Sequence, residues 1–161
     1  MTASEDLKVI RLTDADAERL ATLHAAAFPP GQVWRPAAFR DLLAQDTVRA
    51  HGVMSGATLI AFGLAQIAVD QAEILTLACH PDHRRSGVAR ELLTHLEHIL
   101  SAQGVEKWIL DVAEDNPVAI AFYTALGFQT DGRRPNYYKR LEGGRIDAIL
   151  MSKPMARQIT T

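Results

Sequence analysis

Residues 73–100 read EILTLACHPDHRRSGVARELLTHLEHIL, and the rest of the chain can be interpreted outward from them. The apolar run of residues 72–79 is typical of a buried strand. Residues 80–83, HPDH, break that run. From Gly87 onward, leucine and isoleucine recur at helical spacing, which predicts a long helix that stops at Gly104. The stretch therefore predicts a strand, a short basic turn and a helix in direct succession.

The turn between this strand and this helix has the features of an anion site. Gly87 lets the backbone approach a ligand closely, and the first N–H groups of a helix have no partner within the helix. The positive end of the helix dipole lies at the same point. Arg84, Arg85 and Arg90 add positive charge around it. The turn predicts a site for a phosphate or pyrophosphate group, although an arginine-rich helix start is also common as a solvated cap.

Strands and helices follow one another in a mixed pattern along the remainder of the chain. Apolar or alternating segments predict strands at residues 7–12, 48–54, 59–69, 72–79 and 105–112, from residue 128, and at residues 146–151. Capping residues and helical spacing predict helices at residues 14–27, 36–43, 87–103 and 117–126. Residues 133–145 are expected to form a long polar loop and residues 155–161 a frayed tail. This order predicts an α+β fold with one central mixed sheet, in which the strands flanking the Gly87 helix are parallel.

Composition narrows the classes of function. The chain has 161 residues, 48% of them hydrophobic and 22% charged, which suits one domain with its own core. A net charge of −2 provides no overall attraction for nucleic acid, so no nucleic-acid partner is expected. One cysteine allows no internal disulfide and suits a reducing cytoplasm. Neither a signal peptide nor an apolar run approaching the roughly 20 residues of a membrane span is found.

Two motifs resemble the signatures of the GNAT acetyltransferase superfamily. Residues 84–89, RRSGVA, are similar to its pyrophosphate turn R-x-x-G-x-G, with Ala89 in place of the second glycine. Residues 116–128, NPVAIAFYTALGF, match the more specific pattern N-x-x-A-x-x-[FL]-Y-x-x-x-G-F. The resemblance covers roughly residues 57–151 and implies a single acetyltransferase domain over residues 1–161. It also implies the GNAT fold, with a largely antiparallel sheet splayed between its fourth and fifth strands and helices on both faces.

Four further segments resemble the RimI-type group of this superfamily, the ribosomal-protein-alanine N-acetyltransferases. They are residues 72–78 (AEILTLA), 80–85 (HPDHRR), 132–138 (GRRPNYY) and 144–148 (GRIDA). The resemblance implies direct transfer of an acetyl group from acetyl-CoA to the N-terminal α-amine of a protein, by analogy the alanine of a small-subunit ribosomal protein. A small-molecule amine or a lysine side chain is an alternative acceptor, and a non-catalytic acyl-CoA sensor is an alternative of another class.

The same resemblance implies where acetyl-CoA binds as co-substrate. A strand splayed from its neighbour exposes backbone groups that can pair with the amides of pantetheine. The pyrophosphate is expected on the basic turn. The implied contacts are Leu77, Ala78, Cys79, Arg84, Arg85, Ser86, Gly87, Val88, Ala89, Arg90 and Asn116. Asn116 also suits the N-cap of the next helix, and Cys79 is interpreted as a small core residue and not as a nucleophile.

Proton transfer requires a base for the incoming ammonium and a donor for the leaving thiolate. Tyr123 occupies the position of the family's proton donor, although a tyrosine on an amphipathic helix is also an ordinary core residue. RimI-type enzymes carry glutamate where this chain has Asp111, whose side chain is shorter by roughly 1.5 Å. Other GNAT branches place the base at the position of Glu73. Our hypothesis is that Asp111 and Glu73 share a water chain to the amine.

The acceptor is expected to contact the polar segment near residue 137. Tyr137 and Tyr138 can form the walls of a slot for an extended peptide, and Arg134 is expected to bind the substrate with them. The cations that flank the two tyrosines are Arg133, Arg134, Lys139 and Arg140, and they would favour an acidic substrate. Without the family resemblance, a solvated hairpin would be the simpler interpretation. Histidine pairs three residues apart, at 80 and 83 and at 95 and 98, lack a third ligand nearby, so no metal site is expected.

Overall fold

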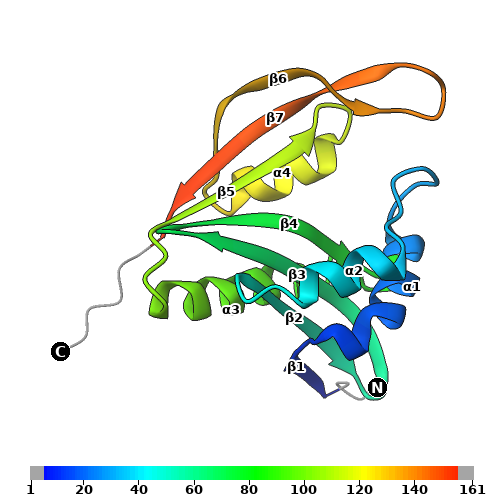
Figure 1. Cartoon of the computed structure of the whole chain (residues 1–161), viewed down its shortest axis with the longest axis vertical. Coiled ribbons are helices and arrows are strands. Elements are labelled where there is room, and N and C mark those ends of the chain that lie inside the picture. Colours follow the sequence, from blue (N-terminus) through cyan, green and yellow to red (C-terminus); the bar gives the residue numbers. More distant parts are fainter. Residues whose placement is uncertain (1–5, 156–161) are drawn as a thin grey trace.

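The computed structural model describes residues 6–155, which form seven strands and four α-helices around one sheet (Figure 1). The helices are α1 (Ala17–Ala27), α2 (Pro36–Leu43), α3 (Val88–Ala102) and α4 (Pro117–Ala125). The strands are β1 (Leu7–Arg11), β2 (Val48–Ser55), β3 (Thr58–Ala68), β4 (Gln71–Cys79), β5 (Lys107–Ala113), β6 (Gln129–Lys139) and β7 (Arg145–Pro154). Short 3-10 turns cover Asp14–Asp16 and Pro81–His83. No helix among these residues is long and apolar enough to cross a membrane.

The sheet has the order β1-β2-β3-β4-β5-β7-β6, and all its neighbouring strands are antiparallel except β4 and β5. The parallel pair flanks α3, as the strand–helix–strand pattern predicts. The predicted mixed α+β sheet is therefore confirmed.

Strands β4 and β5 separate soon after they meet. Their ladder contains three residue pairs, the last of which joins Glu73 to Ile109. Farther along β4, Leu75 is an extra residue in the ladder with β3, because Leu64 pairs with Thr76 and the next residue pairs with Ile74. Such a bulge bends its strand. Figure 1 shows the result, in which β4 and β5 diverge from a common point. The predicted splay between the fourth and fifth strands is confirmed.

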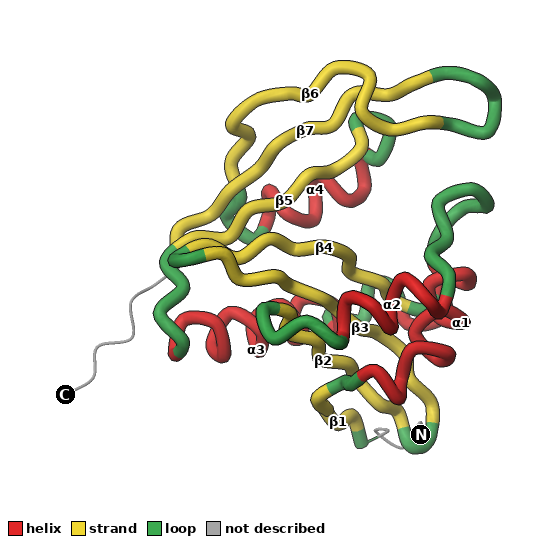
Figure 2. Tube along the Cα trace, viewed as in Figure 1, coloured by secondary structure: helices red, strands yellow, loops and turns green. Residues whose placement is uncertain are grey.

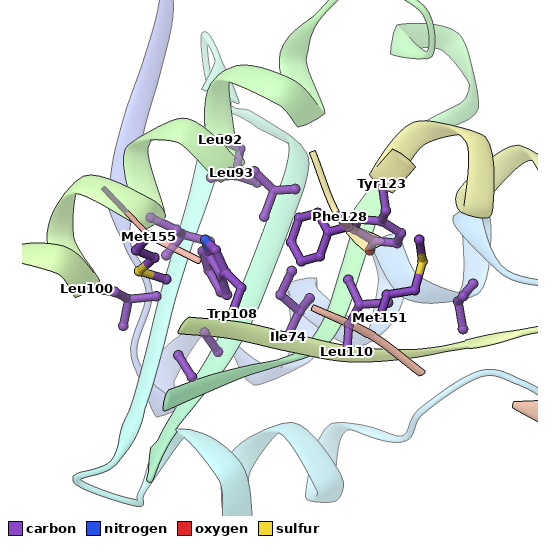
Figure 3. Close-up of a cluster of buried hydrophobic side chains, with 14 of the residues drawn as sticks. Ile74, Leu92, Leu93, Leu100, Trp108, Leu110, Tyr123, Phe128, Met151 and Met155 are labelled. Atoms are coloured by element: carbon purple, nitrogen blue, oxygen red, sulfur yellow. The ribbon is translucent and has the colours of Figure 1, made fainter. Parts of the chain in front are cut away.

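Helices cover both faces of the sheet because apolar side chains alternate along the strands. On one face, α3 and α4 pack over a cluster that includes Trp108, Leu110 and Ile74 (Figure 3). On the other face, α1 and α2 pack over a second cluster that includes Phe62 and Leu64. The leucines of α3 at positions 92, 96 and 100 are almost fully buried. Burying each one stabilises the fold by about 1.5–3 kcal/mol, which fixes α3 and the turn before it.

The structure corrects two predicted boundaries. Residues 133–145 are not one long loop, because β6 continues to Lys139 and β7 starts at Arg145. The start of this strand was predicted, but its length was not, because β6 is a sheet edge and nearly all its residues are exposed, so it lacks an apolar alternation. In addition, Met155 is buried, and its N–H donates to the Glu106 carbonyl at 2.8 Å. The remainder of the predicted tail, residues 156–161, lies outside the described residues.

Candidate active site

The turn before α3 presents a row of backbone donors. Gly87 is the N-cap residue and has φ +85°, a left-handed conformation that glycine adopts without strain. The first helical bond runs from the Glu91 N–H to the Gly87 carbonyl at 3.0 Å. The N–H groups of residues 88–90 precede that bond and are left to a ligand or to solvent. The Ser86 hydroxyl donates to the His83 carbonyl and so closes the turn on itself.

The three arginines of the turn differ in their surroundings. Arg85 and Arg90 are exposed at the mouth of the turn. Arg84 donates through Nη2 to the Ala27 carbonyl at 2.9 Å, which ties the turn to the carboxyl end of α1. Arg84 is therefore partly engaged within the protein, whereas Arg85 and Arg90 extend into solvent.

Beyond the split, the edge of β4 that faces β5 has no strand beside it. Leu77, Ala78 and Cys79 pair with β3 on their other edge, and the ladder with β5 has already ended. Their backbone groups on the open edge can therefore bind an extended ligand with amides. Burial raises the pKa of the Cys79 thiol, so this side chain stays protonated at neutral pH.

Two carboxylates face the split from neighbouring strands. Glu73 is paired with Ile109, and Asp111 lies two residues farther along β5, on the same face as Ile109. Burial and the nearby Asp111 raise the pKa of Glu73, while Arg134 opposes that rise. The Nη1 atom of Arg134 lies 3.9 Å from Oδ2 of Asp111. The charge of Asp111 therefore acts on Glu73 across the split.

Tyr123 reaches the same region from α4. Its ring packs against Phe128 with centroids 5.4 Å apart, within the buried cluster of Figure 3. Burial and the neighbouring Tyr138 raise the pKa of Tyr123, so its hydroxyl remains protonated. At the start of α4, Oδ1 of Asn116 accepts from the Ala119 N–H at 3.1 Å. Asn116 is therefore the helix N-cap, the local role that its position before Pro117 suggests.

Tyr137 and Tyr138, the tyrosines expected to contact the acceptor, lie at a bulge in β6. Arg134 pairs with Ala148, but Tyr138 pairs with Ile146, so β6 carries extra residues at this point. Asn136 lies within the bulge at φ +56°. Beyond it, the rings of Tyr137 and Tyr138 meet edge to face at 5.0 Å. Burial, followed by the charge of Asp111, raises the pKa of Tyr138 to about 12.

The GRIDA segment on β7 holds this bulge in place. Oδ1 of Asp147 accepts from the Asn136 N–H at 2.9 Å, and Nη1 of Arg145 donates to the Asn136 carbonyl at 3.3 Å. Sequence reasoning did not identify Asp147 or Arg145 as site residues. The available signal was that the NYY and GRIDA segments occur together, since the two are opposite sides of one hairpin.

A cleft of about 440 Å³ lies between the α1–α2 loop and the β6–β7 turn, which extend on the same side of the molecule (Figure 2). Arg140 at its wall forms a two-bond fork with Asp115, at 2.9 and 2.7 Å, and lies 5.6 Å from the centre of the Tyr138 ring. A Cβ added at Gly31 would lie 2.6 Å from Cγ of Leu141, so the loop and the turn approach each other closely across the cleft. Neither Asp115 nor Arg140 was predicted, because a pair 25 residues apart leaves no local pattern.

In the described part of the chain, no three histidine, cysteine, aspartate or glutamate side chains gather as a metal site requires. His80 and His83 have ring centroids 6.2 Å apart, and Nδ1 of His80 accepts from the Asp82 N–H in the turn. This pair is part of the turn's own hydrogen bonding.

A sequence model described as the acetyltransferase (GNAT) family matches residues 17–128. The chain belongs to this family. It is also 33% identical, over 91% of its length and 95% of the relative's, to the [ribosomal protein bS18]-alanine N-acetyltransferase of Escherichia coli. It is 35% identical to the N-alpha-acetyltransferase RimI of Mycobacterium tuberculosis, over 86% of this chain and 89% of that protein. These matches identify a GNAT enzyme of the acetyl-CoA-dependent N-acetyltransferase class.

Solved GNAT structures agree with this assignment. The crystal structure of the Escherichia coli ribosomal-protein-S18-alanine N-acetyltransferase superimposes with a TM-score of 0.86 and 29% identity, over 95% of this chain and 96% of that one. Arabidopsis thaliana NAA60 in complex with acetyl-CoA has a TM-score of 0.79 at 20% identity, over 93% and 99% of the two chains. The second likeness concerns the fold alone.

Proposed function

We propose that this GNAT enzyme acetylates the N-terminal α-amine of a protein, with the alanine of a small-subunit ribosomal protein as the acceptor that its relatives suggest. The observation that carries the proposal is the likeness to the bS18-alanine N-acetyltransferase, which extends over nearly the whole of both chains. The tyrosine-bearing bulge of β6 supports it, because its two rings offer an aromatic wall to an extended peptide. The cleft begins at Lys139, the residue after Tyr138, and so continues from that wall. Such an acceptor implies the cytoplasm, where ribosomes are made.

The proposed coenzyme site consists mainly of backbone groups that have no partner in the sheet or helix. Residues 85–90 would hold the pyrophosphate through the free N–H groups and the two exposed arginines. The open edge of Leu77–Cys79 would pair with pantetheine, and Asn116 would contribute from the start of α4. A coenzyme bound in this way would direct its thioester into the split between β4 and β5.

The acceptor side follows from the charges at the split. The amine arrives as an ammonium, and Glu73 or Asp111 takes its proton, directly or through water. The free amine then attacks the thioester carbonyl, and the bond from carbon to sulfur breaks. Tyr123, which burial keeps protonated, donates a proton to the departing thiolate. The second proton that the nitrogen loses on becoming an amide returns to the Tyr123 oxygen, directly or through water. Tyr137, Tyr138 and Arg134 bound the acceptor on its other side.

The test measures thiol release from acetyl-CoA with short peptides. We expect turnover with an alanine N-terminus, and none with the same peptide blocked at its α-amine or with a polyamine. Glu73→Gln and Asp111→Asn should each lower kcat/KM, by about 10²-fold or more for the residue that acts as base. Glu18→Gln is the matched control, because Glu18 pairs with Arg40 on the α1–α2 side. Binding of acetyl-CoA without turnover of any amine would instead favour an acyl-CoA sensor.

A further inference from the structure

The split between β4 and β5 has two carboxylates, the candidate bases, beside one guanidinium. Glu73 on β4 and Asp111 on β5 bring two carboxylates to the split. The cation that acts on both is Arg134 on β6, with Nη1 3.9 Å from Oδ2 of Asp111. Its guanidinium also lies 5.4 Å from the centre of the Tyr137 ring. A single guanidinium, held by an aromatic ring, thus stands beside two acids.

Within residues 6–155, the other polar groups near the pair do not supply a second cation. Tyr138 on β6 faces both carboxylates, and Tyr123 on α4 lies next to Tyr138, but both phenols are held protonated and uncharged. Arg140 is the next guanidinium on this side, and its fork with Asp115 already balances its charge. Removing Arg134 would therefore leave the two acids facing only each other and neutral phenols.

We propose that Arg134 is a positioning residue that sets the protonation of Glu73 beside Asp111, by serving as the counter-ion to these two carboxylates while the acceptor position is empty. The proposal rests on the proposed function, because it assigns the pair the role of base. This role is separate from the acceptor contact proposed above, because here Arg134 acts through the carboxylates and not on the reacting atoms.

The direction in which removing Arg134 moves the pH profile follows from the positive charge that is lost. A guanidinium beside a carboxylate favours the ionised form, so its removal raises the pKa of the acid. More of the base is then protonated at a given acidic pH, and the acidic limb of kcat/KM moves to higher pH. Because Arg134 is about half exposed, solvent weakens the interaction. We expect Arg134→Gln to shift the limb upward by about 0.5 to 1 pH unit.

Arg133 offers a matched control in the next position. Its side chain is 54% exposed against 55% for Arg134, but it pairs with Glu114 and Asp147 and not with Asp111. Arg133→Gln removes the same charge from the same strand and should leave the limb in place. Arg134→Lys keeps the cation, so its acidic limb should lie close to that of the parent enzyme. If Arg134 acted only through packing, the lysine variant would not recover the parent's pH profile.

Carbon-13 NMR titration of the glutamate and aspartate carboxyls provides a readout that needs no turnover. In Arg134→Gln the titration of Glu73 should move to higher pH, and in Arg133→Gln it should coincide with the parent. An unmoved titration in Arg134→Gln, or an equal shift in both variants, would overturn the proposal. If no peptide is turned over, the proposed function fails, whereas the titration still decides whether Arg134 controls the pair.

Discussion

Gly87→Ala tests whether the start of α3 binds the pyrophosphate, and Gly104→Ala is its control. Gly87 has φ +85° and Gly104 has φ +89°, and an added Cβ would meet no atom within 4 Å at either position. Neither substitution creates a clash in the protein, so the cost of each is conformational. Placing alanine in the left-handed region costs about 1–2 kcal/mol. The two variants should therefore lose similar stability, with Tm lower by about 2–4 °C for each kcal/mol.

Coenzyme binding should separate the two variants. The Cβ at position 87 would stand where the pyrophosphate approaches the N–H groups of residues 88–90, whereas Gly104 follows the far end of α3. Losing one charge-assisted hydrogen bond costs about 1.5–3 kcal/mol. That loss raises the Kd of acetyl-CoA by a factor of about ten to a hundred.

Calorimetric titration with acetyl-CoA, together with thermal unfolding of each variant, is the assay. We expect Gly87→Ala, but not Gly104→Ala, to bind acetyl-CoA more weakly than the parent. Both variants should show a similar decrease in Tm. If both variants bind acetyl-CoA as tightly as the parent while losing the same stability, the pyrophosphate does not approach Gly87 and the reasoning is refuted.

Three further predictions concern pH, chemistry and the acceptor. Burial lowers the pKa of His24 and of His51 to about 4, from an ordinary 6.5, so the fold favours their neutral forms. The free energy of unfolding should be level above about pH 6.5 and fall as the pH drops toward 4, and His51→Leu should flatten that fall in urea titrations at stepped pH. Tyr123→Phe should lower kcat by about 10²-fold with little change in the Kd of acetyl-CoA, and an unchanged kcat would remove Tyr123 as the acid. Asp147→Ala frees the Asn136 N–H and should raise the acceptor KM about fivefold at constant acetyl-CoA Kd, as one partly exposed hydrogen bond implies.

Much of the scaffold could be predicted because its signals are local. The apolar run of β4, the glycine at the start of α3 and the capping Asn116 each lie within a few residues of the element that they define. The split between β4 and β5 came from the family resemblance, and the three-pair ladder confirms it. The reason for the bend, the extra residue Leu75, was not foreseen, since the strand reads as a continuous apolar run.

The bulge of β6, which carries the tyrosines proposed to bound the acceptor, was harder to predict because contacts distant in sequence maintain it. Pro135 and Asn136 are residue types that favour a turn, and Asn136 has a left-handed conformation in the structure. Because β6 is an exposed edge strand, it has no apolar alternation that would have indicated a strand instead. β6 stays in the sheet through its ladder with β7, and Asp147 and Arg145 hold the bulge by bonding to Asn136, 11 and 9 residues away. The Asp115–Arg140 fork likewise has no signature in either neighbourhood.

The short ladder between β4 and β5 also bears on how such enzymes diversify. The pyrophosphate turn and the open edge of β4 belong to one half of the sheet, and the aromatic bulge of β6 belongs to the other. Three residue pairs join the two halves along the backbone. Mutations at the exposed positions of β6 can therefore accumulate with little effect on the half proposed to bind the coenzyme, whereas Ile149 and Met151 of β7 share a buried cluster with α3. A lineage that keeps one acyl donor is in this way free to acquire new acceptors.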